Sequence, residues 1–269
     1  MSPAMHNAAF TCLGLDYVYL PFRIPKERLG EAIGGLRGLG FRGINVTIPH
    51  KVAVMSFLDE IEPAAEKIGA VNTIVNDNGR LTGYNTDASG FLLALGQAGF
   101  KPNGKKAVIL GAGGASRAIS FALAGSGAGL VILNRREELD WAEALAGRIR
   151  DTGGWKAAAL ELNPDNLKQA LEGADLLVNA TSLGMHPNIE STPVDKTLLR
   201  PGLFVFDAVY NPLRTRLMRE AGETGATLVS GLDMLIGQGT VAFELWTGEK
   251  SPAAEMKKAA LAELIKGKA

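Results

Sequence analysis

The chain has 269 residues, of which 46% are hydrophobic, and its 28 lysine and arginine residues balance its 28 aspartate and glutamate residues. This length suffices for one large domain or two ordinary ones, and the balanced charge does not favour a nucleic-acid-binding surface. Cys12 is the only cysteine, which excludes an intramolecular disulfide and a cysteine-based zinc site. Since we recognise no signal peptide and no apolar run long enough to cross a bilayer, we expect a cytoplasmic protein without membrane or nucleic-acid partners.

The first part of the chain alternates between helix and strand patterns. A helix is expected from Ser2 to about Leu13, with Ser2 as its N-cap and Pro3 at its first position. The alternating, β-rich stretch 16–22 predicts a strand. Residues 25–40 begin with proline and end with glycine around an apolar stripe, which predicts a helix.

Five further elements are expected before the pattern changes. They are a short strand at 44–48, helices from about His50 and near Pro63–Ile68, and two strands at 71–75 and 80–84. Asn78-Gly79, between the last two strands, is a strong signal for a tight hairpin turn.

From Asp87 onward, apolar strands alternate with helices. The expected strands are 106–110, 130–135, 175–180, 203–209 and 226–230, and the expected helices are 87–99, 115–124, 137–150, 232–246 and 252–265. Short, continuous apolar strands alternating with helices predict a parallel sheet that is covered on both faces. The predicted fold class is therefore α/β, and the change of pattern predicts a domain boundary near Asp87.

A glycine-rich turn directly follows the strand 106–110 and opens the next helix. Gly111, Gly113 and Gly114 let the backbone approach a pyrophosphate, whose charge would meet the free N–H groups at the helix N-terminus. The spacing is imperfect, because Ser116 takes the place of the third glycine. A tight turn without a ligand is the alternative. It is less favoured because the next strand ends as expected for a dinucleotide site.

That next strand ends in Asn134-Arg135-Arg136, about twenty residues after the glycine turn. An arginine at this position accommodates the 2′-phosphate of NADP, whereas an acidic residue binds the ribose of NAD. Arg135 and Arg136 therefore favour NADP, and Glu137 leaves NAD possible. Two solvated arginines at a strand end are the alternative.

Polar residues gather at the ends of the strands in the first part of the chain. They are Asn45, Thr47, Lys51, Asn72, Thr73, Asn85, Thr86 and Asp87. Such a set suits a small polyhydroxylated ligand, and a lysine with an aspartate could move a proton. Each residue also has an ordinary role in a turn, a cap or a solvated surface, and on spacing alone that interpretation is slightly favoured. His6 and His50 have no metal-ligand spacing, so we interpret both as surface or structural residues and expect no metal.

Seven motifs occur in an order that resembles the shikimate/quinate dehydrogenase family. They are NVTIPHK (45–51), AVNT (70–73), NTD (85–87), GAGGASRA (111–118), NATSLGM (179–185), Asp207-x-x-Tyr210-x-Pro212 and Gly231-x-x-Met234-Leu235-x-x-Gln238. Several are specific to this family, and the resemblance extends from Ser2 to the C-terminus.

The resemblance implies an NADPH-dependent, reversible reduction of 3-dehydroshikimate to shikimate in the synthesis of chorismate and the aromatic amino acids. It implies two α/β domains: a substrate domain formed by 1–86 and 231–269, and a Rossmann-type, doubly wound NADP-binding domain formed by 87–230. Lys51 and Asp87 match the catalytic pair. The residues that match substrate-binding positions are Ser2, Thr47, Asn72, Tyr210 and Gln238. The resemblance implies a local structural role for Asn45. The matches to cofactor-binding positions are Gly111, Gly113, Gly114, Ala115, Asn134, Arg135, Arg136, Thr181, Leu183, Gly231 and Met234.

The sequence also departs from the family pattern. Family members usually carry a strand and a Ser-x-Ser motif before this point, and Ser2 matches the second serine. The strand and the first serine are absent from this sequence. Either the start was placed late or the first domain is reduced, and in the second case we expect weaker substrate binding. Asn-Arg-Arg-Glu replaces the usual Asn-Arg-Thr, and Ala88 replaces a common glycine. A quinate/shikimate dehydrogenase using NAD or NADP is therefore one alternative. A nucleotide-binding protein without catalysis is another, against which both Lys51 and Asp87 argue. We expect a monomer or a homodimer.

Overall fold

A computed structural model describes residues 1–266, and it divides into two compact units. The first comprises Met1–Gly90 and the chain from Leu235 onward, and the second is Phe91–Met234. The chain crosses between the units inside two helices, α4 (Thr86–Gln97) and α9 (Gly231–Thr247). The expected boundaries, after residue 86 and before residue 231, fall at the first turns of these helices. Residues 267–269, which the expected first domain includes, lie outside the described residues.

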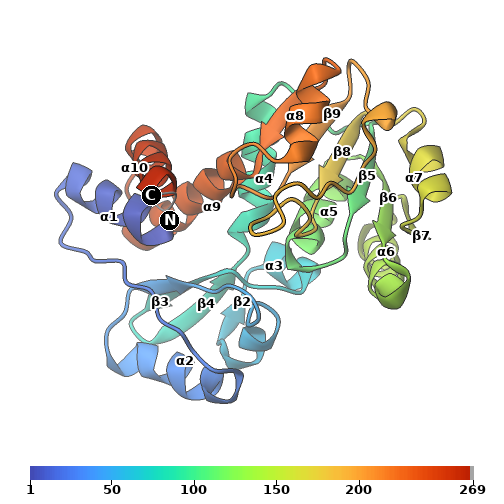
Figure 1. The fold of residues 1–269 in the computed structure, drawn as a ribbon. Helices are drawn as coiled ribbons and strands as arrows, with labels where there is room; N and C mark the ends of the chain where they lie inside the picture. Colours follow the sequence, from blue (N-terminus) through green and yellow to red (C-terminus); the bar gives the residue numbers. More distant parts are fainter. Residues whose placement is uncertain (267–269) are drawn as a thin grey trace. The chain divides into compact units, whose positions relative to one another are not determined.

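The second unit is built on a parallel sheet in the order β10-β9-β8-β5-β6-β7 (Figure 1). The strands are β5 (Lys106–Leu110), β6 (Gly129–Asn134), β7 (Ala157–Glu161), β8 (Leu176–Asn179), β9 (Phe204–Asp207) and β10 (Thr227–Ser230). Chain order reverses between β5 and β8, which is the doubly wound arrangement of dinucleotide-binding domains. The predicted α/β fold class is confirmed.

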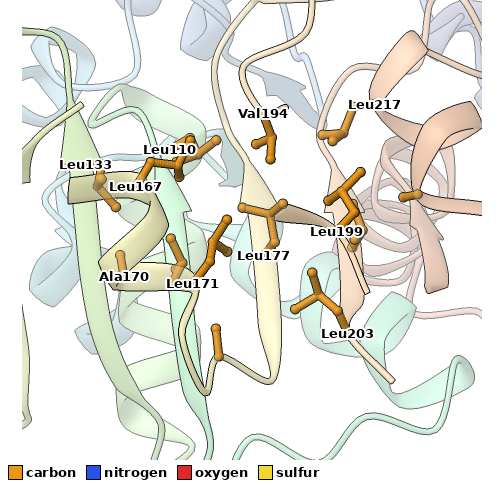
Figure 2. Close-up of a cluster of buried hydrophobic side chains, with 14 residues drawn as sticks. Leu110, Leu133, Leu167, Ala170, Leu171, Leu177, Val194, Leu199, Leu203 and Leu217 are labelled. Carbon is orange, nitrogen blue, oxygen red and sulfur yellow. The ribbon is translucent and has the colours of Figure 1, made fainter. Parts of the chain in front are cut away.

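Helices cover both faces of this sheet. They are α5 (Gly114–Gly125), α6 (Leu139–Gly153), α7 (Pro164–Leu171) and α8 (Arg216–Glu223). On one face, Leu167 and Leu171 of α7 pack with Leu110, Leu177 and other apolar side chains (Figure 2). On the other face, Phe91 of α4 meets Phe206 of β9 edge to face, with ring centroids 4.8 Å apart. The near-continuous apolar strands are thus explained by burial on both sides.

The first unit contains a mixed sheet in the order β1-β3-β4-β2. Its strands are β1 (Gly43–Asn45), β2 (Glu60–Ile61), β3 (Thr73–Asp77) and β4 (Arg80–Tyr84). β3 and β4 form the predicted hairpin, whose turn residues Asn78 and Gly79 have φ values of 52° and 91°. Positive φ at both residues is what a type I′ turn requires, which explains the Asn-Gly pair.

The first unit also contains helices. They are α2 (Leu29–Gly38), α3 (Pro63–Ile68), α1 (Ser2–Leu13), α10 (Ala253–Lys266) and the second part of α9. Ile33 of α2 packs with Ile74 and Leu81 of the sheet. From α9, the indole N–H of Trp246 donates to the carbonyl oxygen of Ile74 at 3.0 Å. Gly43 of β1 is required there, since a Cβ would collide with the Trp246 ring. α1 and α10 lie side by side (Figure 1).

The predicted strand at 16–22 is wrong, because this segment pairs with no strand among the described residues. Its backbone is bonded instead by a side chain: the Asn7 amide donates to the carbonyl oxygen of Tyr19 at 3.0 Å and accepts from the Tyr19 N–H at 2.7 Å. The apolar side chains on either side of Tyr19 stay exposed, with Val18 at 69% and Phe22 at 61%. The period-two pattern of this segment is therefore not accompanied by strand pairing.

Two predictions near Ser2 and His50 also need correction. Ser2 occupies the first position of α1, Met1 is the N-cap, and no side chain caps this helix. Instead, the Ser2 side chain hydrogen-bonds the Tyr19 phenol. The helix expected from about His50 is only a 3₁₀ helix, Ala53–Phe57. No helix within residues 1–266 is long and apolar enough to span a membrane.

His6 of α1 is fully buried among aromatic rings. It stacks on Tyr19 with centroids 4.7 Å apart and lies 5.1 Å from the Trp246 ring. Neither ring nitrogen has a hydrogen-bond partner among the described residues. Burial lowers the pKa of His6 to about 4, because the charged imidazolium would lose its hydration. His6 is therefore a neutral structural residue.

The first prediction concerns acid stability. Since the unfolded chain protonates His6 near its ordinary pKa of 6.5, the unfolded state binds the proton first as the pH falls. The stability that His6 contributes is complete above about pH 6.5 and is lost toward pH 4, by about 2–3 kcal/mol. Urea unfolding of the wild type and of His6→Phe at pH 7.5 and 4.5 should show a smaller acid loss in the variant. Equal losses would contradict this, and His186→Gln, at an exposed histidine, serves as the control.

Candidate active site

The polar residues of the first unit meet at one end of its sheet. β1 runs antiparallel to β3, and β3 runs antiparallel to β4, so the end of β1, the start of β3 and the end of β4 adjoin. Two backbone bonds fix this register: Val46 N–H donates to Asn72 at 2.7 Å, and Asn72 N–H donates to Tyr84 at 3.0 Å. The predicted residues that follow β1, precede β3 and follow β4 are therefore neighbours.

Lys51 and Asp87 form an ion pair at this end of the sheet. Lys51 Nζ lies 2.6 Å from Asp87 Oδ2, and their side chains are only 18% and 11% exposed. Asp87 belongs to the first turn of α4, where the helix dipole favours a negative charge. The carbonyl oxygen of Lys51 accepts from Val71 N–H at 2.8 Å, which anchors the lysine backbone beside β3. A lysine ammonium has three N–H donors, so two remain for a ligand.

The side chain of Asn72 is the centre of a buried hydrogen-bond network. Its oxygen accepts from the Thr73 hydroxyl at 3.0 Å, from the Thr86 N–H at 2.8 Å and from the Thr86 hydroxyl at 3.2 Å. Its amide nitrogen donates to the Thr86 hydroxyl at 3.1 Å. With the oxygen saturated, the second amide N–H is the group that Asn72 offers to a ligand.

Asn45 extends this network toward Ser2. Its nitrogen donates to the Thr73 hydroxyl at 3.0 Å, and its oxygen accepts from the Tyr19 phenol at 3.0 Å. The Ser2 side chain bonds the same phenol, although burial still raises the pKa of Tyr19 to about 12. The principal polar atoms of Asn45 are thus engaged inside the protein, which agrees with a structural role.

Gln238 reaches the network from α9. Its oxygen lies 3.5 Å from the Thr86 hydroxyl, and its nitrogen donates to the Leu235 carbonyl at 2.8 Å. The approach is close because α9 meets α4 at two glycines: a Cβ on Gly237 would lie 2.9 Å from Gly90. Gln238 therefore retains one amide N–H for a ligand. Thr47 is exposed and lies two residues beyond β1.

The predicted site residues divide between the units. The first unit holds Ser2, Thr47, Lys51, Asn72, Asp87 and Gln238. Tyr210, predicted to bind substrate, belongs to the second unit and is 37% exposed. All of the predicted cofactor residues belong to the second unit as well.

In the second unit, the glycine turn lies where the sheet order reverses. Gly111 follows β5 with a φ of 96°, and a Cβ there would lie 3.1 Å from the Ala180 carbonyl oxygen. Gly113 is the N-cap of α5 and provides no side-chain cap, and Gly114 and Ala115 begin the helix. Around Gly113 and Gly114 a Cβ would meet nothing within 4 Å. Uncapped N–H groups beside open space fit a pyrophosphate.

The end of β6 carries the two predicted arginines. Asn134 is buried, and its amide donates to the Glu138 carbonyl at 2.7 Å, which fixes the following turn. Arg135 forms an ion pair with the Glu138 carboxylate, whose pKa this contact lowers. Arginine matches a phosphate in shape and charge, so Arg135 and Arg136 fit the 2′-phosphate of NADP.

The remaining predicted cofactor residues flank the ends of β8 and β10. Thr181 and Leu183 lie in the loop after β8, where the Thr181 hydroxyl accepts from the Leu183 N–H at 3.1 Å. Gly231 opens α9 so close to Ala208 that a Cβ would overlap its carbonyl. Met234 is 8% exposed. The structure brings this set to the carboxyl edge of the sheet.

Sequence reasoning did not single out Tyr19 or Asp207 as site residues. Tyr19 fell inside the wrongly predicted strand 16–22, and only its hydrogen bond to Asn45 reveals a place in the network. Asp207 begins one of the motifs above, but its complete burial, which marks it as unusual, is visible only in the structure. Among residues 1–266, no cluster of three or more histidine, cysteine, aspartate or glutamate side chains is placed to hold a metal ion.

Two family descriptions match the chain. Residues 1–74 match "Shikimate dehydrogenase substrate binding domain", and residues 231–261 match "Shikimate 5'-dehydrogenase C-terminal domain". A shikimate dehydrogenase (NADP(+)) of Moorella thermoacetica is 51% identical over 257 residues, covering 95% of this chain and 86% of the relative.

Solved structures agree with these matches. Shikimate 5-dehydrogenase from Listeria monocytogenes, in complex with shikimate and NAD, has a TM-score of 0.92 and 40% identity, covering 96% of this chain and 91% of its own. The enzyme from Thermus thermophilus, in complex with NADP(H) and shikimate, has a TM-score of 0.86 and 41% identity, covering 97% and 94%. Identity at this level over nearly the whole length confirms what the motifs predict: the chain belongs to the shikimate dehydrogenase family.

Proposed function

We propose that this chain is an NADP-dependent shikimate dehydrogenase, which reversibly reduces 3-dehydroshikimate to shikimate in the synthesis of chorismate and the aromatic amino acids. The observation that carries the proposal is the Lys51–Asp87 pair, 2.6 Å apart beside buried amides with N–H groups to spare. Membership of the family, with a relative named for NADP⁺, supports the same reaction and cofactor. We expect the reaction to take place in the cytoplasm, where a lone exposed thiol such as Cys12 stays reduced.

Lys51 is the proton donor in this proposal. NADPH, when bound, supplies the hydride for the ketone carbon, and Lys51 Nζ gives a proton to the oxygen that becomes the hydroxyl. Asp87 accepts one Nζ–H bond and thereby directs the other two toward the substrate. In the reverse direction, Lys51 takes the hydroxyl proton back.

The substrate ring carries hydroxyl groups and one carboxylate. The first unit has N–H and O–H groups that can hydrogen-bond to them. Asn72 and Gln238 each retain an amide N–H, and the Thr47 hydroxyl is exposed. Ser2 lies at the start of α1, where the helix dipole favours an anion such as the carboxylate. Tyr210, which is 37% exposed, is also a proposed substrate-binding residue.

For the cofactor, the uncapped start of α5 would hold the pyrophosphate. Arg135 and Arg136 would hold the 2′-phosphate at the end of β6, beside the buried Asn134. Thr181, Leu183, Gly231 and Met234 would border the ribose and the nicotinamide. NAD has no 2′-phosphate for the arginines, so NADP is the preferred cofactor.

The second prediction tests the proton donor. Lys51→Ala should lower kcat by roughly 10²–10⁴-fold, the usual contribution of a positioned general acid, and leave NADP⁺ binding unchanged. Oxidation of shikimate followed by NADPH absorbance, with calorimetric titration of NADP⁺, measures both. Lys26→Ala removes a surface lysine of the same unit as the control. A kcat near that of the wild type would exclude the proposed role of Lys51.

The third prediction concerns Tyr19. Tyr19→Phe removes the donor to Asn45 and the partner of Ser2, so Asn45 can rotate and disturb the network around Asn72. We expect the KM for shikimate to rise roughly three- to tenfold, as for one buried hydrogen bond, with kcat and the KM for NADP⁺ within about twofold. Tyr17→Phe is the matched control at an exposed position. An unchanged KM for shikimate would show that the Tyr19 hydroxyl is not required to hold Asn45 in place.

The fourth prediction concerns the Arg135–Glu138 pair. Glu138→Gln frees the guanidinium for the 2′-phosphate, so the KM for NADP⁺ should fall roughly two- to fivefold, and that for NAD⁺ should not change. Glu137→Gln removes the same charge next to it and leaves the pair intact. If both variants lower the KM equally, net charge and not release of Arg135 is the cause.

A further inference from the structure

Asp207 is a completely buried carboxylate that the proposed reaction does not use. It is the last residue of β9, it is 0% exposed, and all three groups that hydrogen-bond to it are neutral. Burial raises its pKa to about 6, against the effect of those hydrogen bonds. A buried carboxylate without a bonded cation is costly, and its hydrogen bonds show what it holds in place.

The geometry joins two loops. Oδ1 accepts from the Asn179 amide at 2.9 Å and from the Val209 N–H at 3.0 Å, and Oδ2 accepts from the Thr215 hydroxyl at 2.6 Å. Asn179 ends β8 and stands directly beside Asp207 in the parallel register. Val209 is the second residue and Thr215 the last residue of the loop 208–215 between β9 and α8. One side chain therefore fixes the exits of two neighbouring strands.

On the β8 side, the connection continues to the predicted cofactor residues. The oxygen of Asn179 accepts from the Thr181 hydroxyl at 2.6 Å and from the Thr181 N–H at 3.1 Å. Its nitrogen, besides bonding Asp207, donates to the Leu183 carbonyl at 3.2 Å. The orientation of the Asn179 amide, which Asp207 sets, thus determines the path of the loop 180–184.

The two loops also touch each other. The Ala208 N–H donates to the Asn179 carbonyl at 2.9 Å, and the His186 N–H donates to the Asn211 carbonyl at 3.3 Å. The loop turns at Gly184, where a Cβ would lie 3.4 Å from the Thr215 Cβ. Displacing the loop 208–215 would therefore displace the loop after β8.

We infer that Asp207 is a positioning residue for cofactor binding: its carboxylate holds Asn179 and Thr215 together, and through Asn179 it sets Thr181 and Leu183 against the NADP ribose and nicotinamide. This inference rests on the proposed function, since the cofactor contacts of Thr181 and Leu183 belong to that proposal. Asp207 itself touches neither cofactor nor substrate in this scheme.

Calorimetric titration with NADP⁺, well below the melting temperature, tests the inference by a readout other than activity. Asp207→Ala should weaken NADP⁺ binding roughly tenfold, because Asn179 loses its anchor. Asp207→Asn should stay within about twofold of the wild type, since the amide oxygen still accepts from Asn179 and Val209 and its NH₂ can donate to Thr215. A purely structural role would lower the melting temperature and leave the affinity of the folded protein unchanged.

Matched variants complete the experiment. Asp195 also accepts from a backbone N–H and a threonine hydroxyl, but it is exposed, so Asp195→Ala should bind NADP⁺ as the wild type does. If Asp207→Ala does not fold, Thr215→Val decides, with an expected roughly threefold loss of affinity. Wild-type affinity in a folded Asp207→Ala, or in Thr215→Val, overturns the inference. Failure of the wild type to bind NADP⁺ or oxidise shikimate would instead overturn the proposed function.

Discussion

The oxygen of the Asn72 side chain organises the polar end of the smaller sheet. Three donors from Thr73 and Thr86 occupy it, which fixes the amide plane and joins the start of β3 to the start of α4. Asp87 follows Thr86 directly, so the position of its carboxylate depends on this junction. A buried amide cannot exchange these partners for water, so the network holds Asn72, Thr73 and Thr86 in place. The Lys51–Asp87 pair takes its place from that arrangement.

The parallel sheet was predictable because each of its central strands has a continuous apolar sequence. Val108, Val178 and Val205 belong to short apolar runs between turn signals, which are typical of strands buried on both faces. The segment 16–22 shows the limit of this reasoning. Its hydrophobic alternation was real, but a strand also needs a neighbouring strand, and Asn7 bonds the backbone of one residue only, Tyr19. The edge strand β7 (Ala157–Glu161) went unpredicted because its half-buried residues carry little pattern.

For the site, residue types were predictable and partners were not. Lys51 and Asp87 are 36 residues apart, and their contact follows from the register of three short strands, which the sequence does not state. Ser2 shows the same limit: local rules favour a cap, yet its side chain bonds a phenol 17 positions further on, in a segment that no sheet holds. Long-range hydrogen bonds determine which polar side chains are satisfied within the protein and which keep a free donor or acceptor for a ligand.

The two units fix the loops at the ends of their strands with different side chains. Each must fix loops at the ends of its strands, and the first does so with neutral amides and hydroxyls around Asn72. The second uses the ionisable Asp207, although burial penalises its charge. Two carboxylate oxygens accept from three donors, one at the end of β8 and two in the loop 208–215, without donating anything in return. An amide must also satisfy its own N–H groups, as Asn72 does through Thr86. At Asp207 a carboxylate receives all three donors at once, whereas an asparagine would have to turn its NH₂ toward the Thr215 hydroxyl, which can also accept.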